Sequence, residues 1–298
     1  MSPSRRAFLG GVAGLATVAA LGSCTIGHDG KATAAMDLDD QIDQLTRSLR
    51  PDQKYRNPTS GEYNSALDAV DAMMRNAADG EAHDRLGALG FTLRDVDDAK
   101  SGRKFSVAVS EKDTDRAWGM VVVDRSAPPR LQIEVPHPRA DEGTERIGLQ
   151  VLRAVPGSVL LVAGAHRRAG NDLADVAHDD RSLFHALATR SVDDRLFALQ
   201  LHGFADESLM SRDVVISAGP GDPSRAIGKL ADNLADTRLD VCRAWRDKCG
   251  QLEGTLNVQA NVAKDLGRDF CHLEMNATTR SKHSDIVVDA IAKTFRRR

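Results

Sequence analysis

The chain has 298 residues, of which 41% are hydrophobic and 28% are charged. This composition excludes disordered and collagen-like proteins, and the length allows one large domain or two ordinary ones. The 40 basic and 43 acidic residues give a formal net charge of −3, and aromatic residues make up only 4%. Neither the charge nor the aromatic content favours nucleic-acid binding, so we expect a globular enzyme or binding domain with no nucleic-acid partner.

The first 24 residues resemble the export signal of bacterial lipoproteins that use the twin-arginine route. Arg5 and Arg6 open the motif SRRAFLG, an uncharged apolar run covers residues 7–22, and the run ends in LGSC at Cys24. Such a run is short for a membrane span. The resemblance implies a signal peptide at 1–23, lipid attachment at Cys24 and a position on the outer face of the cell membrane. The alternative is an ordinary export signal in which Cys24 is incidental.

The rest of the chain is expected to be a tether followed by one domain. Residues 24–61 mix Gly, Asp, Ser, Pro and Ala around one short expected helix at 38–49, as is typical of a tether. Residues 62–298 form the expected α/β domain. It begins with a helix at 65–78 and with β-rich runs at 105–109 and 120–123, which predict a hairpin or two adjacent strands.

From residue 131 onwards, expected strands and helices alternate along the chain. The expected strands are 131–135, 158–163, 196–201, 213–217 and 269–275. The expected helices are 144–155, 180–189, 224–234 and 286–295. This alternation predicts a largely parallel mixed sheet with helices on both faces.

Polar side chains follow, or lie near the ends of, four of these strands. They are His137, His166, Arg167, Arg168, His202, His272 and Glu274. Because the carboxyl ends of the strands form the ligand crevice of open α/β sheets, we expect these side chains to share one site. A histidine taken alone would more often be structural. The coincidence at several strand ends is what favours a functional site.

Residues 131–280 also resemble the zinc carboxypeptidase superfamily, and its N-formylglutamate amidohydrolase-like branch in particular. The segment IEVPH at 133–137 is similar to the strand that opens the family's metal site, and LEMN at 273–276 is similar to its closing strand. The resemblance implies one zinc ion held by His137, His202 and an acidic residue, with Glu274 as the general base. It also implies hydrolysis of an amide bond in an N-acyl amino acid or a small peptide that bears a carboxylate.

The acidic zinc ligand departs from the family pattern. The carboxypeptidase pattern has a glutamate three residues after the first histidine, where this chain has Ala140. The candidates are Asp141, Glu142 and Glu145. We favour Glu145, because it lies in the first turn of the expected helix, where its carboxylate can point back to the strand end. Asp141 is the close alternative.

The arginines near the strand ends are candidates for contacts with substrate. Arg167 suits a developing oxyanion, whereas Arg168 and His166 suit a substrate carboxylate, which a guanidinium binds through two hydrogen bonds. One of the two arginines is expected to make only a surface ion pair. Arg280 is a further candidate for the carboxylate, and its alternative role is a structural ion pair with Glu274.

Other polar and cysteine residues are expected to support the structure. Asp175 or His178 could orient a ligand histidine, although a solvated loop is an equal alternative. Cys242 and Cys249 are predicted to form a disulfide outside the cytoplasm, and Cys271 is expected to be a buried thiol. The competing functions are a lipid-anchored protein that binds a small anion on Arg167 and Arg168, and a relative of the enzymes that has lost its metal.

Overall fold

The computed structural model describes residues 37–75, 80–193 and 196–296. The predicted export signal and Cys24 lie outside these residues. The strands are β1 (Phe91–Asp98), β2 (Arg103–Ser110), β3 (Gly119–Asp124), β4 (Leu131–Val135), β5 (Ser158–Ala163), β6 (Phe197–Phe204), β7 (Val214–Ser217), β8 (Val241–Arg243) and β9 (Phe270–Asn276). The helices are α1 (Leu38–Arg47), α2 (Ser60–Met74), α3 (Gly80–Ala88), α4 (Thr144–Ala154), α5 (Leu183–Asp193), α6 (Arg225–Ala235), α7 (Val258–Asp265), α8 (Ala277–Lys282) and α9 (Ser284–Phe295).

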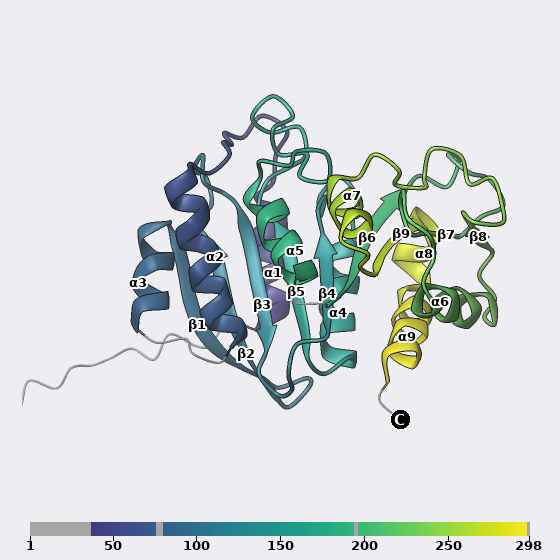
Figure 1. The fold of residues 1–298 in the computed structure, drawn as a ribbon, viewed down its shortest axis with the longest axis horizontal. Helices are drawn as coiled ribbons and strands as arrows, with labels where there is room; N and C mark the ends of the chain where they lie inside the picture. Colours follow the sequence, from purple (N-terminus) through teal and green to yellow (C-terminus); the bar gives the residue numbers. More distant parts are fainter. Residues whose placement is uncertain (1–36, 76–79, 194–195, 297–298) are drawn as a thin grey trace, which may run out of the picture. The chain divides into compact units, whose positions relative to one another are not determined.

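The described strands form one mixed sheet, in the order β1-β2-β3-β5-β4-β6-β9-β7-β8 (Figure 1). Strands β5, β4, β6 and β9 run parallel to one another at its centre. Strands β1, β2 and β3 join the sheet in antiparallel pairs, and β7 pairs antiparallel to β9. The antiparallel pairing of β2 with β3 confirms the expected neighbouring strands. The four central strands place their carboxyl ends at one edge of the sheet.

Helices cover both faces of the sheet, as expected from the alternating elements. On one face, α1, α4, α6 and α9 contribute to a single large apolar cluster with the sheet. On the other face, α2, α3 and α5 pack on the first half of the sheet, and α7 packs on β6 and β9. The α/β class with a mixed, doubly covered sheet is therefore confirmed.

The tether predicted for residues 24–61 is wrong in its second part. Leu38, Ile42 and Leu45 of α1 are each no more than 3% exposed and belong to the main core cluster. The next helix, α2, begins at Ser60 rather than at residue 65, because Thr59 and Glu62 form a capping box. The compact domain accordingly starts near residue 35. The short helix expected in this segment is present as α1, but its apolar side chains are buried in the core of the domain instead of lying in a tether.

Replacing Ile42 with alanine tests whether α1 belongs to the domain. Because this side chain is fully buried, we expect the variant to lose about 2–4 kcal/mol of unfolding free energy in a urea titration. Gln44→Ala, on the exposed side of the same helix, should change it by no more than about 0.5 kcal/mol. Equal unfolding free energies of the two variants would show that α1 belongs to the tether and does not pack on the domain.

The three adjacent strands β4, β6 and β9 each alternate between apolar and polar side chains. The apolar residues at alternate positions, from Leu131, Phe197 and Cys271 onwards, belong to the cluster under α4, α6 and α9. Strand alternation therefore turns their polar residues to the opposite face, toward α5 and α7. These residues are Gln132, Glu134, Gln200, His202, His272 and Glu274. The predicted placement of Leu273 and Met275 opposite His272 and Glu274 is confirmed.

The cysteine predictions are also confirmed. Cys242 and Cys249 form a disulfide, and Cys271 is a buried free thiol. The disulfide lies beside β8, the short strand that ends the sheet.

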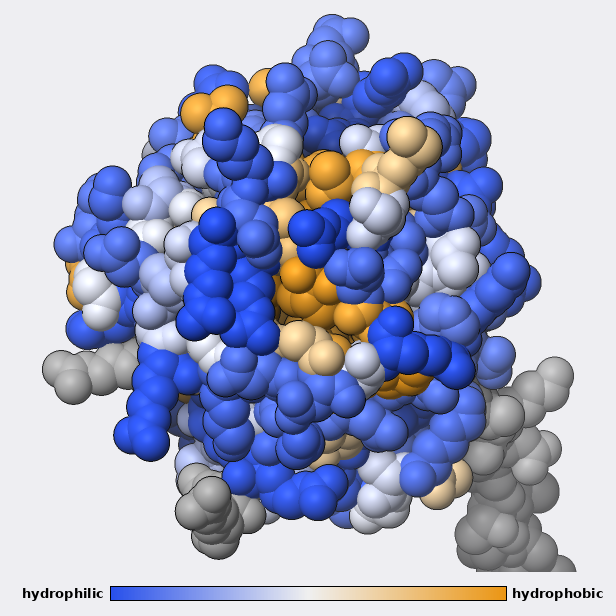
Figure 2. Space-filling model, turned by 90° about the vertical axis from the view of Figure 1, so that its right-hand side faces the viewer, coloured by the Kyte–Doolittle hydropathy of each residue, from blue (hydrophilic) through white to orange (hydrophobic). Residues whose placement is uncertain are grey.

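The side of the molecule with β7, β8 and α6 shows an apolar area ringed by hydrophilic residues (Figure 2). Within the described part of the chain, every helix is too short or too polar to cross a bilayer.

Candidate metal centre and active site

His137 lies just after β4, and its Nε2 atom contacts the carboxylate of Asp175. Its Nε2 lies 2.7 Å from Oδ1 of Asp175, in the loop after β5. The same carboxylate accepts a hydrogen bond of 2.6 Å from Nη2 of Arg167. Of the two residues expected to orient a site histidine, Asp175 is therefore the one that does so. His178 contacts this carboxylate too, at 3.1 Å, but its side chain is exposed.

His202 lies within β6 rather than after it, because this strand extends three residues beyond its expected end. Its Nε2 is 2.6 Å from Oε1 of Gln200, which lies two residues earlier on the same face of the strand. Its Nδ1 is 3.2 Å from Oδ2 of Asp141. The imidazole therefore bridges a buried amide and a buried carboxylate.

Asp141, not Glu145, lies between the two histidines. The chain turns after His137, whose carbonyl accepts from the backbone N–H of Asp141. This turn puts Oδ2 of Asp141 3.4 Å from Nδ1 of His137. Glu145 is buried in the first turn of α4, where its Oε2 accepts from the backbone N–H of Gly143. The preference for Glu145 is corrected, because its carboxylate caps its own helix.

The hydrogen bonds on Nε2 of each histidine, which points away from Asp141, determine whether Nδ1, which faces Asp141, carries a proton or a lone pair. An ionised carboxylate and an amide oxygen only accept, so Nε2 of His137 and Nε2 of His202 each carry the proton. Both Nδ1 atoms then carry lone pairs, and both face the same oxygen of Asp141. Consistent with this, Nδ1 of His137 is buried and has no hydrogen-bond partner among the described residues. Three acceptor atoms this close need a positive charge among them, which a metal ion or an additional proton on a histidine can supply.

The dimensions of this group fit a zinc ion. Zinc–nitrogen and zinc–oxygen bonds of about 2.0–2.2 Å in a tetrahedron separate neighbouring ligand atoms by about 3.4 Å. The measured separations from Asp141 Oδ2 are 3.4 Å to His137 and 3.2 Å to His202. One ligand atom of each of the three residues lies within 4.8 Å of the other two. We therefore identify His137, Asp141 and His202 as the set that can hold a metal.

The pKa values of Asp141, His137 and His202 are set by burial and by the charges that these side chains exert on one another. Burial would raise the pKa of Asp141, but the two histidines outweigh it and hold that pKa well below its usual range. Burial lowers the pKa of His137, and the carboxylates of Asp141 and Asp175 raise it by more. For His202 burial dominates and lowers the pKa. An ionised Asp141 and a neutral His202 are the forms that bind metals.

Glu274 lies in β9 next to His202, its register partner in β6. It is 8% exposed, and its Oε2 is buried without a hydrogen-bond partner in the described structure. Burial, followed by the charge of Asp141, raises the pKa of Glu274 to about 8. No ion pair joins it to Arg280 within the described residues, so the structural partner considered for this carboxylate is wrong. A buried carboxyl group with a raised pKa and an unpaired oxygen, next to residues that could hold a metal, is a candidate for proton transfer.

A second possible metal group shares His202 with Glu274 and His272. The rings of His202 and His272 stack with their centroids 4.4 Å apart. Burial, followed by the charge of His202, lowers the pKa of His272 far below its usual range, so this ring is neutral. The group with Asp141 is the better set, because hydrogen bonds on Nε2 direct both of its histidines.

The arginines divide between paired and exposed positions. Arg167 makes its ion pair with Asp175, whereas Arg168 is exposed and its backbone N–H donates to Nδ1 of the half-buried His166. Burial, followed by the charges of Arg168 and Arg167, lowers the pKa of His166. Of the two arginines, the ion pair expected for one is thus made by Arg167.

Arg280 is anchored to the backbone beside Glu274. Its guanidinium donates to the carbonyl oxygens of Glu142, Phe204 and Met275. Gly203 makes this possible, because a Cβ atom there would overlap the guanidinium. The charge of Arg280 acts on both Asp141 and Glu274.

Gly203→Ala should therefore expel the Arg280 guanidinium and leave its backbone carbonyls without their donor. We expect a loss of about 1–3 kcal/mol of unfolding free energy, measured by urea titration. Gly228→Ala is the matched control, because no atom lies within 4 Å of its added Cβ in α6. That control should gain up to about 1 kcal/mol. An unchanged Gly203→Ala variant would show that Arg280 is not held as described.

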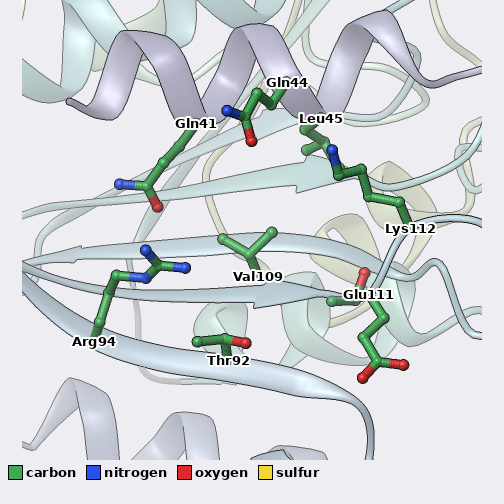
Figure 3. A pocket seen from close by; sticks show the side chains of 9 residues that line it. Gln41, Gln44, Leu45, Thr92, Arg94, Val109, Glu111 and Lys112 are labelled. Carbon is green, nitrogen blue, oxygen red and sulfur yellow. The ribbon is translucent and has the colours of Figure 1, made fainter. Parts of the chain in front are cut away.

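A separate pocket lies between α1 and the β1–β2 pair (Figure 3). Its volume is about 280 Å³, and Gln44, Arg94, Glu111 and Lys112 are among its lining residues. None of the residues that line it comes from the strand ends around His137 and His202. The metal group therefore does not belong to this pocket.

Gln200 is the site residue that the sequence reasoning missed. A glutamine in an apolar strand gave no family motif, although its place two residues before His202 puts both on one strand face. Asp141 is only the close alternative on the sequence, because the turn after His137 cannot be inferred from the residues.

Comparison with known proteins gives only distant similarities. No protein-family model matches the chain, and no curated protein matches it. It is similar to the zinc-free form of YndL, with 16% identity and a TM-score of 0.42 over 58% of this chain and 87% of that chain. It is also similar to a "putative metallopeptidase" from Shewanella denitrificans OS217, with 16% identity and a TM-score of 0.36 over 83% of this chain and 97% of that one.

A further "putative metallopeptidase", from Shewanella amazonensis SB2B, shows 16% identity and a TM-score of 0.35 over 73% of this chain and 92% of that one. Similarity at this level carries no argument about activity. The function is therefore argued from the residues of this chain.

Proposed function

We propose that this protein is a metal-dependent hydrolase of amide bonds, with one zinc ion held by His137, His202 and Asp141. The convergence of two Nδ1 lone pairs on one oxygen of Asp141 carries the proposal. This arrangement supports a bound cation, and zinc is an ion that two imidazoles and a carboxylate commonly bind. Bound there, zinc would supply Lewis-acid polarisation of a carbonyl and activation of water.

The chain's own residues provide the remaining groups that amide hydrolysis needs. Glu274 is the general base: it lies beside His202, lacks a partner for Oε2 and accepts a proton readily, as its raised pKa indicates. It can then return that proton to the leaving amine. Arg167 and Arg280 lie close enough for their charges to act on Glu274, and they favour negative charge that develops on the substrate carbonyl.

The proposed substrate is an N-acyl amino acid or a short peptide with a free carboxylate. Arg168 is exposed near His166, and the charges of Arg139 and Arg167 also act on that histidine. This concentration of positive charge beside the metal group suits a substrate carboxylate. We further propose that the protein is exported by the twin-arginine route and anchored to the membrane through Cys24, on the residues of its N-terminal segment.

Metal content and hydrolysis together test the proposed function. The full chain, purified without chelator, should contain about one zinc per molecule by elemental analysis. It should release free amino acid from N-formyl or N-acetyl amino acids, lose this activity to a chelator and regain it with zinc. Substrates whose carboxylate is amidated should react at least tenfold more slowly.

The rival functions predict different results. A protein that binds these carboxylates with no hydrolysis and no zinc would be an anion-binding protein instead. A protein that neither takes up zinc nor hydrolyses amides would be a relative without its metal, and the proposal would be wrong.

A further inference from the structure

We infer that Gln200 and Glu134 are positioning residues that select the tautomer of His202 and so make its Nδ1 a metal ligand. The inference deepens the proposed function, on which it rests. Neither residue offers a ligand atom to the metal, and Gln200 contacts the metal group only through Nε2 of His202. Glu134 of β4 and Gln200 of β6 are register partners in the sheet, and Gln200 lies two residues before His202 on the same face of β6.

The two residues belong to a fully buried polar network. Gln200 donates through Nε2 to Oε2 of Glu134 at 2.7 Å, and Gln132 donates to the other carboxylate oxygen at 2.6 Å. Each of the three side chains has 0% exposure. The Nε2 groups of Gln132 and Gln200 are thus both paired with Glu134, whereas Oε1 of Gln132 has no hydrogen-bond partner among the described residues. The two paired contacts hold the Glu134 carboxyl group and the Gln200 amide in a definite orientation, because breaking either would leave a buried polar group unpaired.

The orientation of the Gln200 amide is determined from both of its ends. On the nitrogen side, Nε2 faces Glu134 and also Oε1 of Gln259, at 3.3 Å. Gln259 is itself oriented, because its Nε2 donates to the backbone carbonyl of Val176 at 2.8 Å. Burial raises the pKa of Glu134 to about 7, so at pH 8 this carboxyl group is ionised and only accepts. Both groups that face the Gln200 nitrogen are then acceptors, and the amide cannot turn over without placing its oxygen against them.

On the oxygen side, Oε1 of Gln200 accepts from Nδ2 of Asn257 and lies 2.6 Å from Nε2 of His202. Asn257 is oriented as well, because its own oxygen accepts from the backbone N–H of Ala260 at the start of α7. An acceptor thus faces Nε2 of His202, which must carry the proton. The lone pair of this ring is left on Nδ1, facing Asp141.

The two histidines of the metal group are consequently oriented by different chemistry. His137 has an ionised carboxylate, Asp175, on its Nε2, whereas His202 has a neutral amide. Groups that hydrogen-bond a metal-binding histidine fix its tautomer and typically change metal affinity by about 10- to 100-fold when removed. Glu134 acts one step further away, since it holds the amide that holds the ring.

Imidazole nitrogen NMR of the metal-free full chain, labelled in histidine, tests the inference at pH 8. The signals of His202 are those lost in His202→Gln. The wild type should show His202 as the single Nε2–H tautomer. Gln200→Leu should give a mixture and lower zinc affinity by about 10- to 100-fold. Glu134→Gln preserves the shape but lets the Gln200 amide reverse, so it should also give mixed tautomers, and it decides the question if Gln200→Leu does not fold.

Gln132→Leu is the matched control. It removes an equally buried amide from the same carboxylate but leaves the contacts of Gln200 with Glu134 and Gln259 in place. It should lose stability while keeping a single tautomer, with zinc affinity within about twofold of the wild type.

Two results would overturn the inference: an Nδ1–H tautomer of His202 in the wild type, or an unchanged tautomer in both Gln200→Leu and Glu134→Gln. The tautomer is read without metal. A wild type that shows the Nε2–H tautomer but takes up no zinc would therefore refute the proposed function and leave the role of Gln200 supported.

Discussion

Asp141→Asn is expected to abolish stoichiometric zinc binding, with a loss of affinity of more than about 100-fold. The reason is that Asp141 contributes the one oxygen on which both histidines converge, and an amide is a far weaker zinc ligand than a carboxylate. The metal-free variant should remain folded, because the new amide nitrogen can donate to a lone pair on His137 or His202. Isothermal titration with zinc, together with the melting temperature of the metal-free protein, measures both effects.

Glu145→Gln is the control for this prediction, since both side chains are buried acids within one turn of chain. Glu145 Oε2 contacts the backbone of Gly143 and belongs to neither metal group. Its replacement should leave zinc affinity within about threefold of the wild type. If Glu145→Gln lost zinc and Asp141→Asn retained it, Glu145 would be the acidic zinc ligand and Asp141 would not.

The sequence predicts which side chains meet at the strand ends, because parallel strands place their carboxyl ends at one edge of the sheet. Once 131–135 and 269–275 are recognised as strands, alternation places Glu274 opposite Leu273, and parallel pairing brings His137 and His202 to one edge. These inferences need only local patterns. They hold even though β6 extends beyond its expected end.

The third ligand could not be predicted in this way, because it depends on a turn. Asp141 reaches the histidines only since its backbone N–H bonds back to the carbonyl of His137. Nothing in the residues between them distinguishes this turn from an earlier start of α4, which would have favoured Glu145. The same limit applies to α1, whose burial depends on a distant helix, α4, rather than on its own composition.

Glu274→Gln should retain zinc and the fold but lower turnover by about 100- to 10,000-fold, as removal of a general base does. Glutamine has the shape of the carboxyl group without its basicity, and among the described residues Oε2 of Glu274 has no partner that the substitution would remove. The Michaelis constant should change by much less than turnover, because the base acts on the reacting groups rather than on the substrate carboxylate. Steady-state kinetics on the preferred N-acyl amino acid, at equal zinc content, separates the two effects.

The pH dependence of stability gives an independent test of the same carboxyl group. Burial raises the pKa of Glu274 to about 8, above its ordinary value of 4.5, so the folded protein holds this proton after the unfolded chain has released it. The metal-free wild type should therefore lose unfolding free energy as the pH rises from about 4.5 to about 8. Glu274→Gln should remove this part of the loss. If Glu274 were instead a structural ion-pair partner, the variant would melt at a lower temperature at every pH above 5 and would hydrolyse substrate at the wild-type rate per folded molecule.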